Sequence, residues 1–573
     1  MNFFTDNQDL SFIFENTDIQ SIVSGYEDDF RENDRFDYAP SDYADARDSY
    51  RRVLILAGDL AARIVSPLGK ALDDEHTTIE NGTTVYSPAL ARCVQALSQA
   101  ELMGCCIARE YGGLNLPTFI FTMLVEIIAR ADGGLQNIFG LQGIAGIIET
   151  FADQKLKEKY LPLFAQGKVT GAMALTEEEA GSDLQNVKMR AAEQADGTWL
   201  LNGVKRFITN GGAEVLLVLA RSEQGTTDGL GLSLFLCEAG PAITVRRLED
   251  KLGIHSSPTC ELVFHDTPAF LIGDRQRGLM TYVLSLLNGA RLATAAQAVG
   301  IAHAAFCEAL AYARLRKQYG RRIELLPAVA AMLVDMQMDI EASRALTCET
   351  ARLMDLALAT DKRLAVGGFA ADEKKQLKKD AKRYERSLML LTSLAKYYCS
   401  EMSVRVTSTA MQVLAGSGYM RDYPVEKYYR DARITTIYEG TSQLQVMSAQ
   451  RSILSGVMEK YFDELAAAQF DRPQAALAKR LEHGRELMRQ AAEQLSAAAD
   501  SQLTDLCSRD LIDMACDITM GYLLLHQSGA SARKLKMARL FITSREHCIR
   551  MRSLRIKAAD TQLLQDYAEL MGA

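Results

Sequence analysis

Hydrophobic residues recur at three- and four-residue spacing over most of the first 168 positions. This pattern predicts helices over 46–65, 90–103, 118–130 and 144–164. Pro117 precedes the third of these, where proline favours the start of a helix. Residues 1–45 mix aromatic side chains with acids, and we expect them to lie on the main body. The pattern therefore predicts an N-terminal extension over 1–45 and an N-terminal helical domain over 46–169.

The pattern changes near Thr170 to short hydrophobic runs broken by Gly and Pro. Asn202-Gly203 stands between the runs 199–201 and 204–209, and this dipeptide is typical of a β-hairpin turn. Further strands are predicted over 215–220, 232–237, 243–247 and 261–265. We therefore predict a middle β-domain over 170–278, inserted between helical regions.

Helical spacing returns at residue 279 and continues almost to the end of the chain. It predicts a C-terminal helical domain over 279–458 and an additional helical domain over 459–573. Within the first of these, the charged stretch 361–386 contains Gly367-Gly368, and we interpret it as a solvent-facing loop and helix start. The expected fold is mainly α with one inserted β-domain.

Composition and charge argue against several classes of protein. The formal net charge is −9, which argues against a protein built mainly to hold nucleic acid. Residues 1–49 hold 13 acids and 3 arginines, so no secretory or mitochondrial address is visible there. No stretch of the chain is apolar enough to span a membrane. We expect a cytoplasmic protein.

Neither a metal site nor a common nucleotide-binding loop is predicted. The 11 cysteines are scattered and read as reduced thiols, and the 7 histidines show no ligand spacing. No GxGxxG follows a strand and no GxxxxGK[ST] is present. The chemistry must come from other segments.

Two segments of the predicted β-domain place polar and aromatic groups together. In 174–183, Thr176 and Ser182 supply hydroxyls, and Gly181 permits close approach of a ligand to the backbone. In 202–211, Phe207 and Thr209 are two residues apart and so share one face of a strand. Alternatively, these are an ordinary Glu-rich loop and part of a sheet core.

A third segment, 428–443, contains a candidate general base. Glu439 follows the apolar Ile437-Tyr438 and precedes Gly440, which suggests a carboxylate in a poorly solvated turn. Burial favours the neutral form and raises the pKa, as suits a base that must hold a proton near pH 7. The alternative is a helix N-terminus capped by Thr441 or Ser442.

Together these segments resemble the acyl-CoA dehydrogenase family, over about residues 45–452. The resemblance implies an N-terminal helical domain, a middle β-domain and a C-terminal four-helix domain. It also implies α,β-dehydrogenation of an acyl-CoA to a trans-2-enoyl-CoA, with FAD as cofactor. Glu439 would be the α-proton acceptor, and its backbone N–H would bind the thioester oxygen. The added terminal segments resemble those of the longer bacterial members.

The resemblance also assigns cofactor contacts. These fall on Leu175, Thr176, Ser182, Phe207, Thr209, Arg316, Tyr319, Gln412, Gly416, Thr441 and Gln443. Phe207 stands where most members have Trp, and Ala415 replaces the first Gly of the run 412–418. In the family, the residue matched by Arg316 reaches the FAD pyrophosphate of the neighbouring subunit, so a homo-oligomer, most simply a homodimer, is expected.

Substrate and partner assignments follow from the same resemblance. Ser182, Asn288, Arg291 and Gly440 are the expected acyl-CoA contacts. The family usually passes its electrons to an electron-transfer flavoprotein. An acyl-CoA oxidase needs the same base, and a flavoprotein of this fold whose main task is binding nucleic acid or membrane is a further alternative.

The stretch 531–557 bears on the binding alternative, since it holds nine Lys/Arg and one Glu. We interpret it as an amphipathic helix that packs on the body and pairs with acids elsewhere, including those of the N-terminal segment. Attraction to an anionic membrane surface or to DNA is the competing interpretation. We expect no nucleic-acid partner, while peripheral contact with a membrane stays open.

Overall fold

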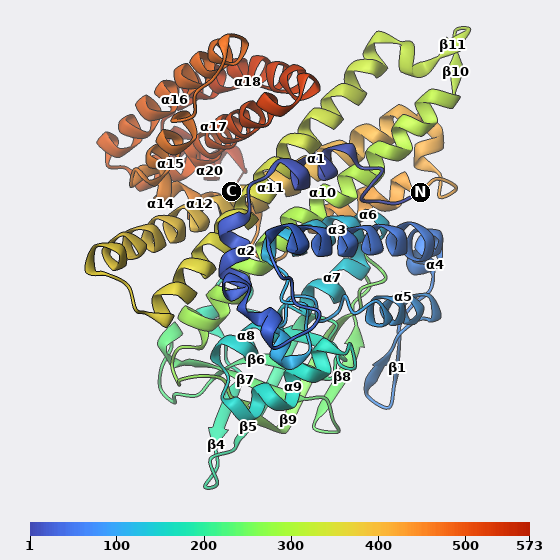
Figure 1. Cartoon of the computed structure of the whole chain (residues 1–573), viewed down its shortest axis with the longest axis vertical. Coiled ribbons are helices and arrows are strands. Elements are labelled where there is room, and N and C mark those ends of the chain that lie inside the picture. The colour runs from blue at the N-terminus through green and yellow to red at the C-terminus, as the bar shows by residue number, and fades with distance from the viewer. Residues whose placement is uncertain (573) are drawn as a thin grey trace.

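The computed structural model of the protein describes residues 1–572 and shows a mainly helical fold around one β-domain. Figure 1 shows the β-domain at the bottom, with long helices running diagonally above it and further helices at the top left. The predicted fold class is confirmed. The domain boundaries at 45, 169, 278 and 458 stay predictions.

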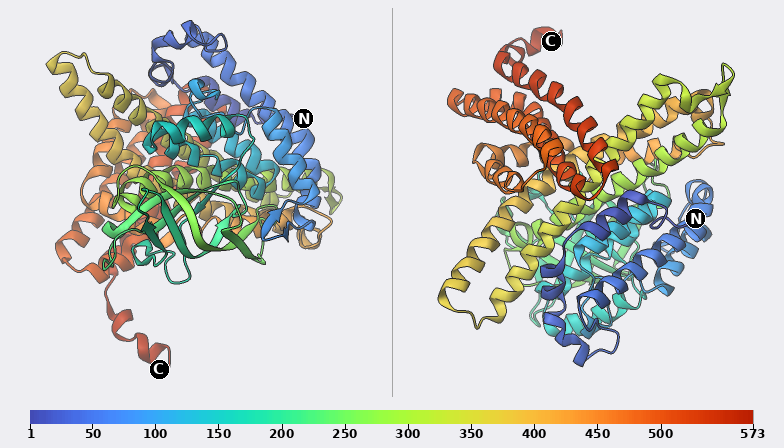
Figure 2. Two further views of the ribbon diagram at one scale, coloured as in Figure 1. Left: turned by 90° about the horizontal axis from the view of Figure 1, so that it is seen from below. Right: turned by 45° about the horizontal axis from the view of Figure 1, so that its top comes forward.

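The N-terminal part is helical, with one small hairpin. Its elements are α1 (Gln8–Asn16), α2 (Gln20–Tyr26), α3 (Tyr43–Leu60), α4 (Gly69–Asp74), β1 (Thr78–Glu80), β2 (Thr83–Val85), α5 (Pro88–Gln99), α6 (Thr118–Ala131), α7 (Gly133–Leu141), α8 (Ile144–Phe151) and α9 (Gln154–Ala165). Phe4, Leu10 and Phe14 are buried in the same core as α3 and α6. The first residues are therefore an integral part of this domain, as the right-hand view of Figure 2 shows.

The β-domain is built on a closed ring of strands. Its strands are β3 (Gly171–Ala174), β4 (Arg190–Glu193), β5 (Trp199–Thr209), β6 (Val215–Arg221), β7 (Leu232–Glu238), β8 (Ile243–Leu248) and β9 (Thr259–Leu271). Pairing runs from β6 through β4, β5, β9 and β7 back to β6, while β3 and β8 extend it beside β6 and β9. Apolar side chains fill the ring, and α8 and α9 pack against the same core.

The hairpin predicted at Asn202-Gly203 is wrong. β5 runs through this dipeptide as one strand antiparallel to β9, and its register with β9 shifts between Leu201 and Gly203. The Asn202 amide exchanges hydrogen bonds of 2.8 and 2.9 Å with Asp266. A Cβ at Gly203 would approach Met189 to 3.0 Å. The Asn-Gly pair therefore serves a bulge and a close contact, because the neighbouring strand is long enough to pair on both sides of it.

Three long helices form the centre of the C-terminal half. The elements are α10 (Leu284–Leu315), β10 (Lys317–Gln318), β11 (Arg321–Arg322), α11 (Pro327–Val366), α12 (Ala371–Leu414), α13 (Val425–Ile434) and α14 (Ser442–Leu454). The loop predicted over 361–386 is wrong in extent, because only residues 367–370 connect α11 to α12. Gly367 and Gly368 both have positive φ and make this turn. The surrounding charges lie on the helices themselves, where a solvated face explains them.

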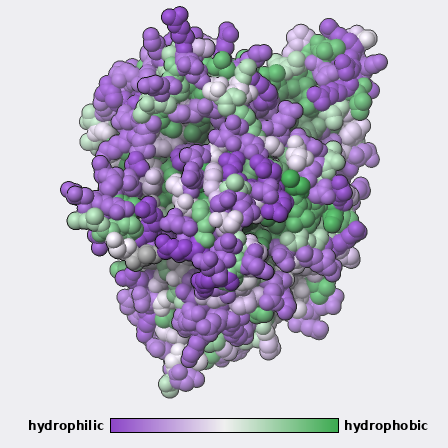
Figure 3. Space-filling model, viewed as in Figure 1, coloured by the Kyte–Doolittle hydropathy of each residue, from purple (hydrophilic) through white to green (hydrophobic). Residues whose placement is uncertain are grey.

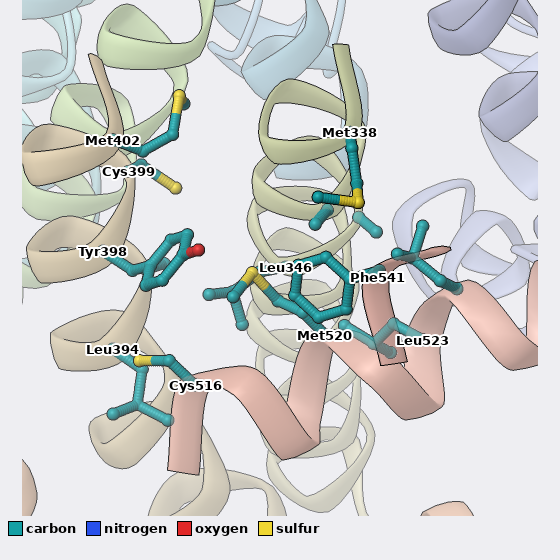
Figure 4. Packing of buried hydrophobic residues seen from close by; sticks show 14 of the residues in the cluster. Met338, Leu346, Leu394, Tyr398, Cys399, Met402, Cys516, Met520, Leu523 and Phe541 are labelled. Atoms are coloured by element: carbon teal, nitrogen blue, oxygen red, sulfur yellow. The ribbon is translucent and has the colours of Figure 1, made fainter. Parts of the chain in front are cut away.

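The additional helices share one core with the central helices. They are α15 (Val457–Ala466), α16 (Arg472–Ala498), α17 (Ser501–Gln527), α18 (Ala532–Ala558), α19 (Gln562–Gln565) and α20 (Tyr567–Leu570). Figure 4 shows Met520 and Phe541 of this region beside Leu346 of α11, in the core that also contains Tyr398 of α12. The additional domain is therefore fixed to the main body by apolar burial.

A buried ion cluster links four parts of the chain. Arg344 of α11 pairs with Asp9 of α1 at 2.5 Å and with Glu126 of α6 at 2.7 Å. Lys534 of α18 pairs with Asp9 and also with Glu341 of α11, the latter at 2.9 Å. All five side chains are at most 6% exposed. Each charge has a partner, which a buried charge requires.

The basic helix α18 pairs largely with acids of the body. Six of its nine Lys/Arg form ion pairs, five of them with acids outside the helix, and Lys534 reaches Asp9 in the N-terminal segment. This arrangement is the packed helical face that the sequence predicts. The absence of a nucleic-acid partner stays a prediction.

The outer surface is mixed rather than broadly apolar. Figure 3 shows one face that is mostly hydrophilic, with scattered hydrophobic patches. Among residues 1–572, no helix is long and apolar enough to cross a membrane.

Arg344→Met should destabilise the protein by about 3–5 kcal/mol, because it leaves the buried carboxylate of Glu126 without its partner and Asp9 with Lys534 alone. Thermal and denaturant unfolding followed by circular dichroism would measure the shift. Arg489→Met removes an exposed pair on α16 and is the matched control, with little expected effect. Equal midpoints for the two variants would contradict this role for the cluster.

Candidate active site

The segments predicted around Thr176 and Phe207 lie side by side. The backbone N–H of Arg206 in β5 donates to the Thr176 carbonyl at 2.9 Å. The Lys205 ammonium is fully buried and donates to the Leu175 carbonyl at 2.8 Å and to Glu177 at 2.9 Å. Burial lowers the pKa of Lys205 to about 8. This lysine, which the sequence analysis missed, holds the loop after β3 against β5.

Phe207 and Thr209 are presented at the surface of the β-domain. The register of β5 shifts between Lys205 and Ile208, and Phe207 has φ +59° and is 53% exposed. Ile208 is buried between Phe207 and the partly exposed Thr209. The bulge therefore turns an aromatic ring outward, beside a hydroxyl.

Thr176 and Ser182 lie in the neighbouring loop. Thr176 is partly exposed and Ser182 exposed. A Cβ on Gly181 would meet the Thr176 side chain at 3.7 Å, an ordinary contact, so space alone does not require this glycine. Leu175, by contrast, is buried, and its carbonyl serves the Lys205 contact. We call the exposed and partly exposed residues Thr176, Ser182, Phe207 and Thr209 the aromatic shelf.

The aromatic shelf has unused hydrogen-bonding groups. Within residues 1–572, the hydroxyls of Thr176 and Thr209 make no side-chain hydrogen bond. An exposed ring flanked by two free hydroxyls fits a flat aromatic ligand with polar edges, such as a flavin ring. The residues of the shelf are therefore compatible with FAD.

Glu439 lies in a tight turn between α13 and α14. Glu439 has φ +55° and Gly440 has φ +89°. The Ser442 N–H donates to the Thr436 carbonyl at 3.0 Å and closes the turn. The positive φ of Gly440 favours glycine, and a Cβ there would also lie 2.6 Å from the Gln445 amide nitrogen and displace that side chain.

The segment around Glu439 is both a poorly solvated turn and the capped N-terminus of a helix. The Thr441 hydroxyl caps α14 by accepting from the Leu444 N–H at 3.4 Å. Gln443 is exposed on the first turn of the same helix. The cap fixes the start of α14 and so fixes the residue before it, where the acid stands.

The Glu439 carboxylate is poorly solvated. Its Oε2 atom is buried and has no hydrogen-bond partner within residues 1–572. Burial raises the pKa of Glu439, and the positive charges of Lys396 and then Arg291 oppose that rise. An unpartnered carboxylate with a raised pKa is what a proton acceptor needs.

Two polar side chains that the sequence analysis missed support this turn. The Lys396 ammonium of α12 donates to the Gly440 carbonyl at 2.6 Å. The Gln445 amide donates to the Glu439 and Gly440 carbonyls at 3.1 and 3.3 Å. The one indication of Lys396 in the sequence is a lone lysine directly after the mainly apolar stretch 388–395 of a predicted helix.

Arg291 and Asn288 lie at the N-terminal end of α10, close to the base. They are three residues apart and so lie on the same side of the helix. The Arg291 Nε atom is buried without a partner within residues 1–572. Burial lowers the pKa of Arg291, while the Glu439 charge opposes that change. The arginine, at least, belongs to the neighbourhood of Glu439.

A series of buried hydrogen bonds connects the turn that carries Glu439, which we call the base turn, to the β-domain. The Tyr438 hydroxyl lies 3.1 Å from the Asn137 amide oxygen of α7 and also contacts the Gln297 amide oxygen of α10, and its one proton is donated to one of these two acceptors at a time. The Asn137 amide then donates to the Ser257 hydroxyl at 3.4 Å, in the loop before β9. The turn is thus braced from both neighbouring domains. No sequence motif marked this series.

The remaining predicted cofactor residues form a separate group. Arg316 and Tyr319 follow α10, while Gln412 and Gly416 lie at the end of α12. Tyr312 and Ser417 hydroxyls lie 3.3 Å apart and link these two ends. Tyr319 is 90% exposed. In Figure 1 the β10–β11 hairpin of this group stands at the top right, away from the β-domain.

This group does not meet Glu439 within one chain. Arg316 follows Arg291 by 25 positions along α10, a separation of about 37 Å at the rise of an α-helix. One subunit therefore keeps Arg316 apart from Glu439. The expected role of Arg316 in the site of a neighbouring subunit stays a prediction. We call Arg316, Tyr319, Gln412 and Gly416 the distal group.

Ala415 within this region has an unusual backbone. Its φ of +53° and ψ of −134° fall where L-residues are strained, and the resemblance places Gly there. Such a conformation costs about 1–3 kcal/mol. The Ala side chain thus keeps the turn shape of a glycine at an energetic cost.

A cleft of about 770 Å³ lies next to the aromatic shelf. Its walls come from α4, from the segment before β9 and from Arg421. Thr259 lines it and pairs directly with Thr209 in the sheet. No predicted site residue lines this cleft, so the site is defined by the shelf and the base turn instead.

Family models cover most of the chain. Residues 59–168, 172–267 and 277–454 match the N-terminal, middle and C-terminal domains of acyl-CoA dehydrogenases, and 455–563 match the model described as acyl-CoA dehydrogenase C terminal. The curated "Acyl-CoA dehydrogenase, short-chain specific" of Megasphaera elsdenii is 33% identical over 63% of this chain and 89% of its own length.

The chain is also similar to solved structures. Acyl-CoA dehydrogenase complexed with FAD from Bacillus anthracis aligns with a TM-score of 0.73 and 25% identity, over 89% of this chain and 88% of that one. A chain from the structure described as electron transferring flavoprotein of Acidaminococcus fermentans aligns with a TM-score of 0.61 and 31% identity, over 71% of this chain and 97% of that one.

Proposed function

The chain belongs to the acyl-CoA dehydrogenase family, oxidoreductases that act on CH–CH bonds, and from this premise we propose that Glu439 removes the α-proton of an acyl-CoA. The observation that carries this proposal is the buried Oε2 of Glu439, which lacks a partner within residues 1–572. The α-C–H bond breaks, its proton passes to this carboxylate, and the developing negative charge lies on the thioester oxygen. The Glu439 N–H is the donor that the family resemblance assigns to this oxygen.

We propose that FAD binds on the aromatic shelf. Phe207 would stack against the flavin ring, and the Thr176 and Thr209 hydroxyls would meet its polar edge. Bound FAD supplies the acceptor for the β-hydride, so that a trans-2-enoyl-CoA results. The FAD complex of the Bacillus anthracis relative supports this cofactor. The protein contributes alignment of the acyl chain between the shelf and the base.

We propose a short-chain acyl-CoA as the first substrate to test, because the Megasphaera elsdenii relative is described as short-chain specific. Asn288, Arg291 and Gly440 would line the acyl-CoA beside the base. An electron-transfer flavoprotein is the proposed acceptor, which the Acidaminococcus fermentans comparison supports. An oxidase uses the same base and would differ only in passing electrons to oxygen.

We propose a homodimer as the smallest complete unit, and the position of the distal group supports this. Arg316 is exposed and lies too far from Glu439 to serve the same site. Its guanidinium fork suits a phosphate, and in the family the matched residue serves the neighbouring subunit. We propose that the distal group completes the FAD site of a second copy.

Glu439→Gln should keep FAD and acyl-CoA binding and slow flavin reduction by about 10²–10⁴-fold, since an amide cannot accept the proton. Anaerobic stopped-flow absorbance with butanoyl-CoA would measure the rate. Glu493→Gln makes the same chemical change at an exposed site on α16 and is the control. A Glu439→Gln rate close to wild type would assign the base to another residue.

Arg316→Ala should weaken FAD retention at least about tenfold, because a charged hydrogen bond contributes about 1.5–3 kcal/mol. Equilibrium dialysis would give the affinity, and sedimentation velocity the oligomeric state. Arg363→Ala removes another exposed guanidinium, at the end of α11, as control. A monomer with full FAD content and full activity is incompatible with a shared site.

A further inference from the structure

Lys396 is a buried cation of α12 that none of the reactions above uses directly. It is fully buried, and its ammonium donates to the Gly440 carbonyl at 2.6 Å. An ammonium has three donors, and this is its only side-chain hydrogen bond within residues 1–572. Burying such a cation is costly unless a nearby negative charge offsets the loss of water. Packing alone therefore does not explain why a lysine occupies this buried position.

The carboxylates near Lys396 differ in how far they are already engaged. Glu401, on the same helix, accepts from the Ser442 hydroxyl at 2.6 Å and pairs with Arg509 of α17 at 3.1 Å. Glu439 has an Oε2 without a donor within residues 1–572. Arg291 of α10 is the other cation near both. Glu439 is thus the acid on which the Lys396 charge acts with least competition.

The titration properties of the pair agree with this geometry. Burial lowers the pKa of Lys396 to about 7, while the Glu439 charge opposes that change. Burial raises the pKa of Glu439, and Lys396 is the largest opposing influence. The two groups therefore titrate as an interacting pair.

The backbone contact has its own consequence. Glu439 and Gly440 are consecutive residues with positive φ, a conformation that non-glycine residues rarely adopt. Lys396 and Gln445 both donate to the Gly440 carbonyl. This contact ties the turn that carries the base to the rigid helix α12, whose position depends on the bundle core.

We propose that Lys396 is a positioning residue for α-proton abstraction, holding the Glu439–Gly440 turn and keeping the Glu439 carboxylate ionised in its buried site. This inference rests on the proposed role of Glu439 as base. In this role Lys396 would contact neither the acyl chain nor the proton in transit. Its charge acts most strongly once a bound substrate excludes water, since electrostatic interactions strengthen in a low dielectric.

The first test measures the Glu439 carboxyl itself, without turnover. Infrared difference spectra across pH would follow the carboxyl band that disappears in Glu439→Gln. Lys396→Gln removes the positive charge but keeps an amide donor for the Gly440 carbonyl. Since the lysine charge lowers the pKa of Glu439, its loss should raise the midpoint of this band by about one pH unit.

The second test measures the pH dependence of flavin reduction by butanoyl-CoA. The rate rises with pH as Glu439 ionises, so Lys396→Gln should move the acid limb upward by about one unit. At acidic pH the variant would be about tenfold slower, and at high pH the two rates should converge. Lys396→Arg restores the charge and should return the limb toward wild type. Lys375→Gln, on an exposed part of α12, is the control.

Each outcome decides between charge coupling and packing. A uniformly slower Lys396→Gln enzyme with an unmoved acid limb and infrared midpoint would reduce Lys396 to a structural role. If Lys396→Gln does not fold, a Lys396→Arg enzyme that folds with a wild-type midpoint supports the proposal, and a displaced midpoint refutes it. A wild type that no acyl-CoA reduces refutes the proposed function instead, while the infrared midpoint still judges the coupling.

Discussion

The pairing of Arg344 with buried carboxylates is the interaction that makes four segments one body. A guanidinium in this position must be met by acids from several directions, and Asp9 and Glu126 come from helices far apart in sequence. Lys534 extends the same cluster to the additional domain. Because an unpaired charge inside the protein is so unfavourable, the N-terminal segment, α6, α11 and α18 have to dock together. Apolar burial then fills the space around them.

The turn that carries Glu439 differs from the Arg344 cluster, because its buried charge has no directly bonded partner of opposite sign within residues 1–572. Glu439 keeps one oxygen without a donor, and its nearest cations act through space rather than by direct contact. The cost of this arrangement is met by its surroundings, which include the Thr441 cap and the clamp of Lys396 and Gln445 on the backbone. A reactive carboxylate thus sits in an otherwise over-determined turn, as expected for strain at a functional site. The rigid cluster and the reactive turn meet on α11 and α12, which belong to one core.

Local patterns were sufficient for the fold class and for the poorly solvated turn at Glu439, whose role as the base stays a proposal. Strand periodicity located β6 to β9, and the Ile-Tyr-Glu-Gly-Thr context placed an acid before a capped helix. Tertiary partners were not readable: Asn202-Gly203 became a bulge because β9 continues past it. The charges of 361–386 extended two helices and left only a short loop. Lys396 and Asn137 were missed since their partners lie far away in sequence, and helix length alone separates Arg316 from Glu439.

The central claim is that a bound acyl thioester is oxidised beside Glu439 on the aromatic shelf. The most direct measurement is anaerobic mixing of the FAD-loaded protein with acyl-CoA thioesters of increasing chain length, beginning with butanoyl-CoA. The account predicts loss of the oxidised flavin absorbance together with formation of the matching trans-2-enoyl-CoA, identified by mass spectrometry. A protein that binds FAD and the whole acyl-CoA series, yet leaves the flavin oxidised and the thioesters unchanged, would contradict it.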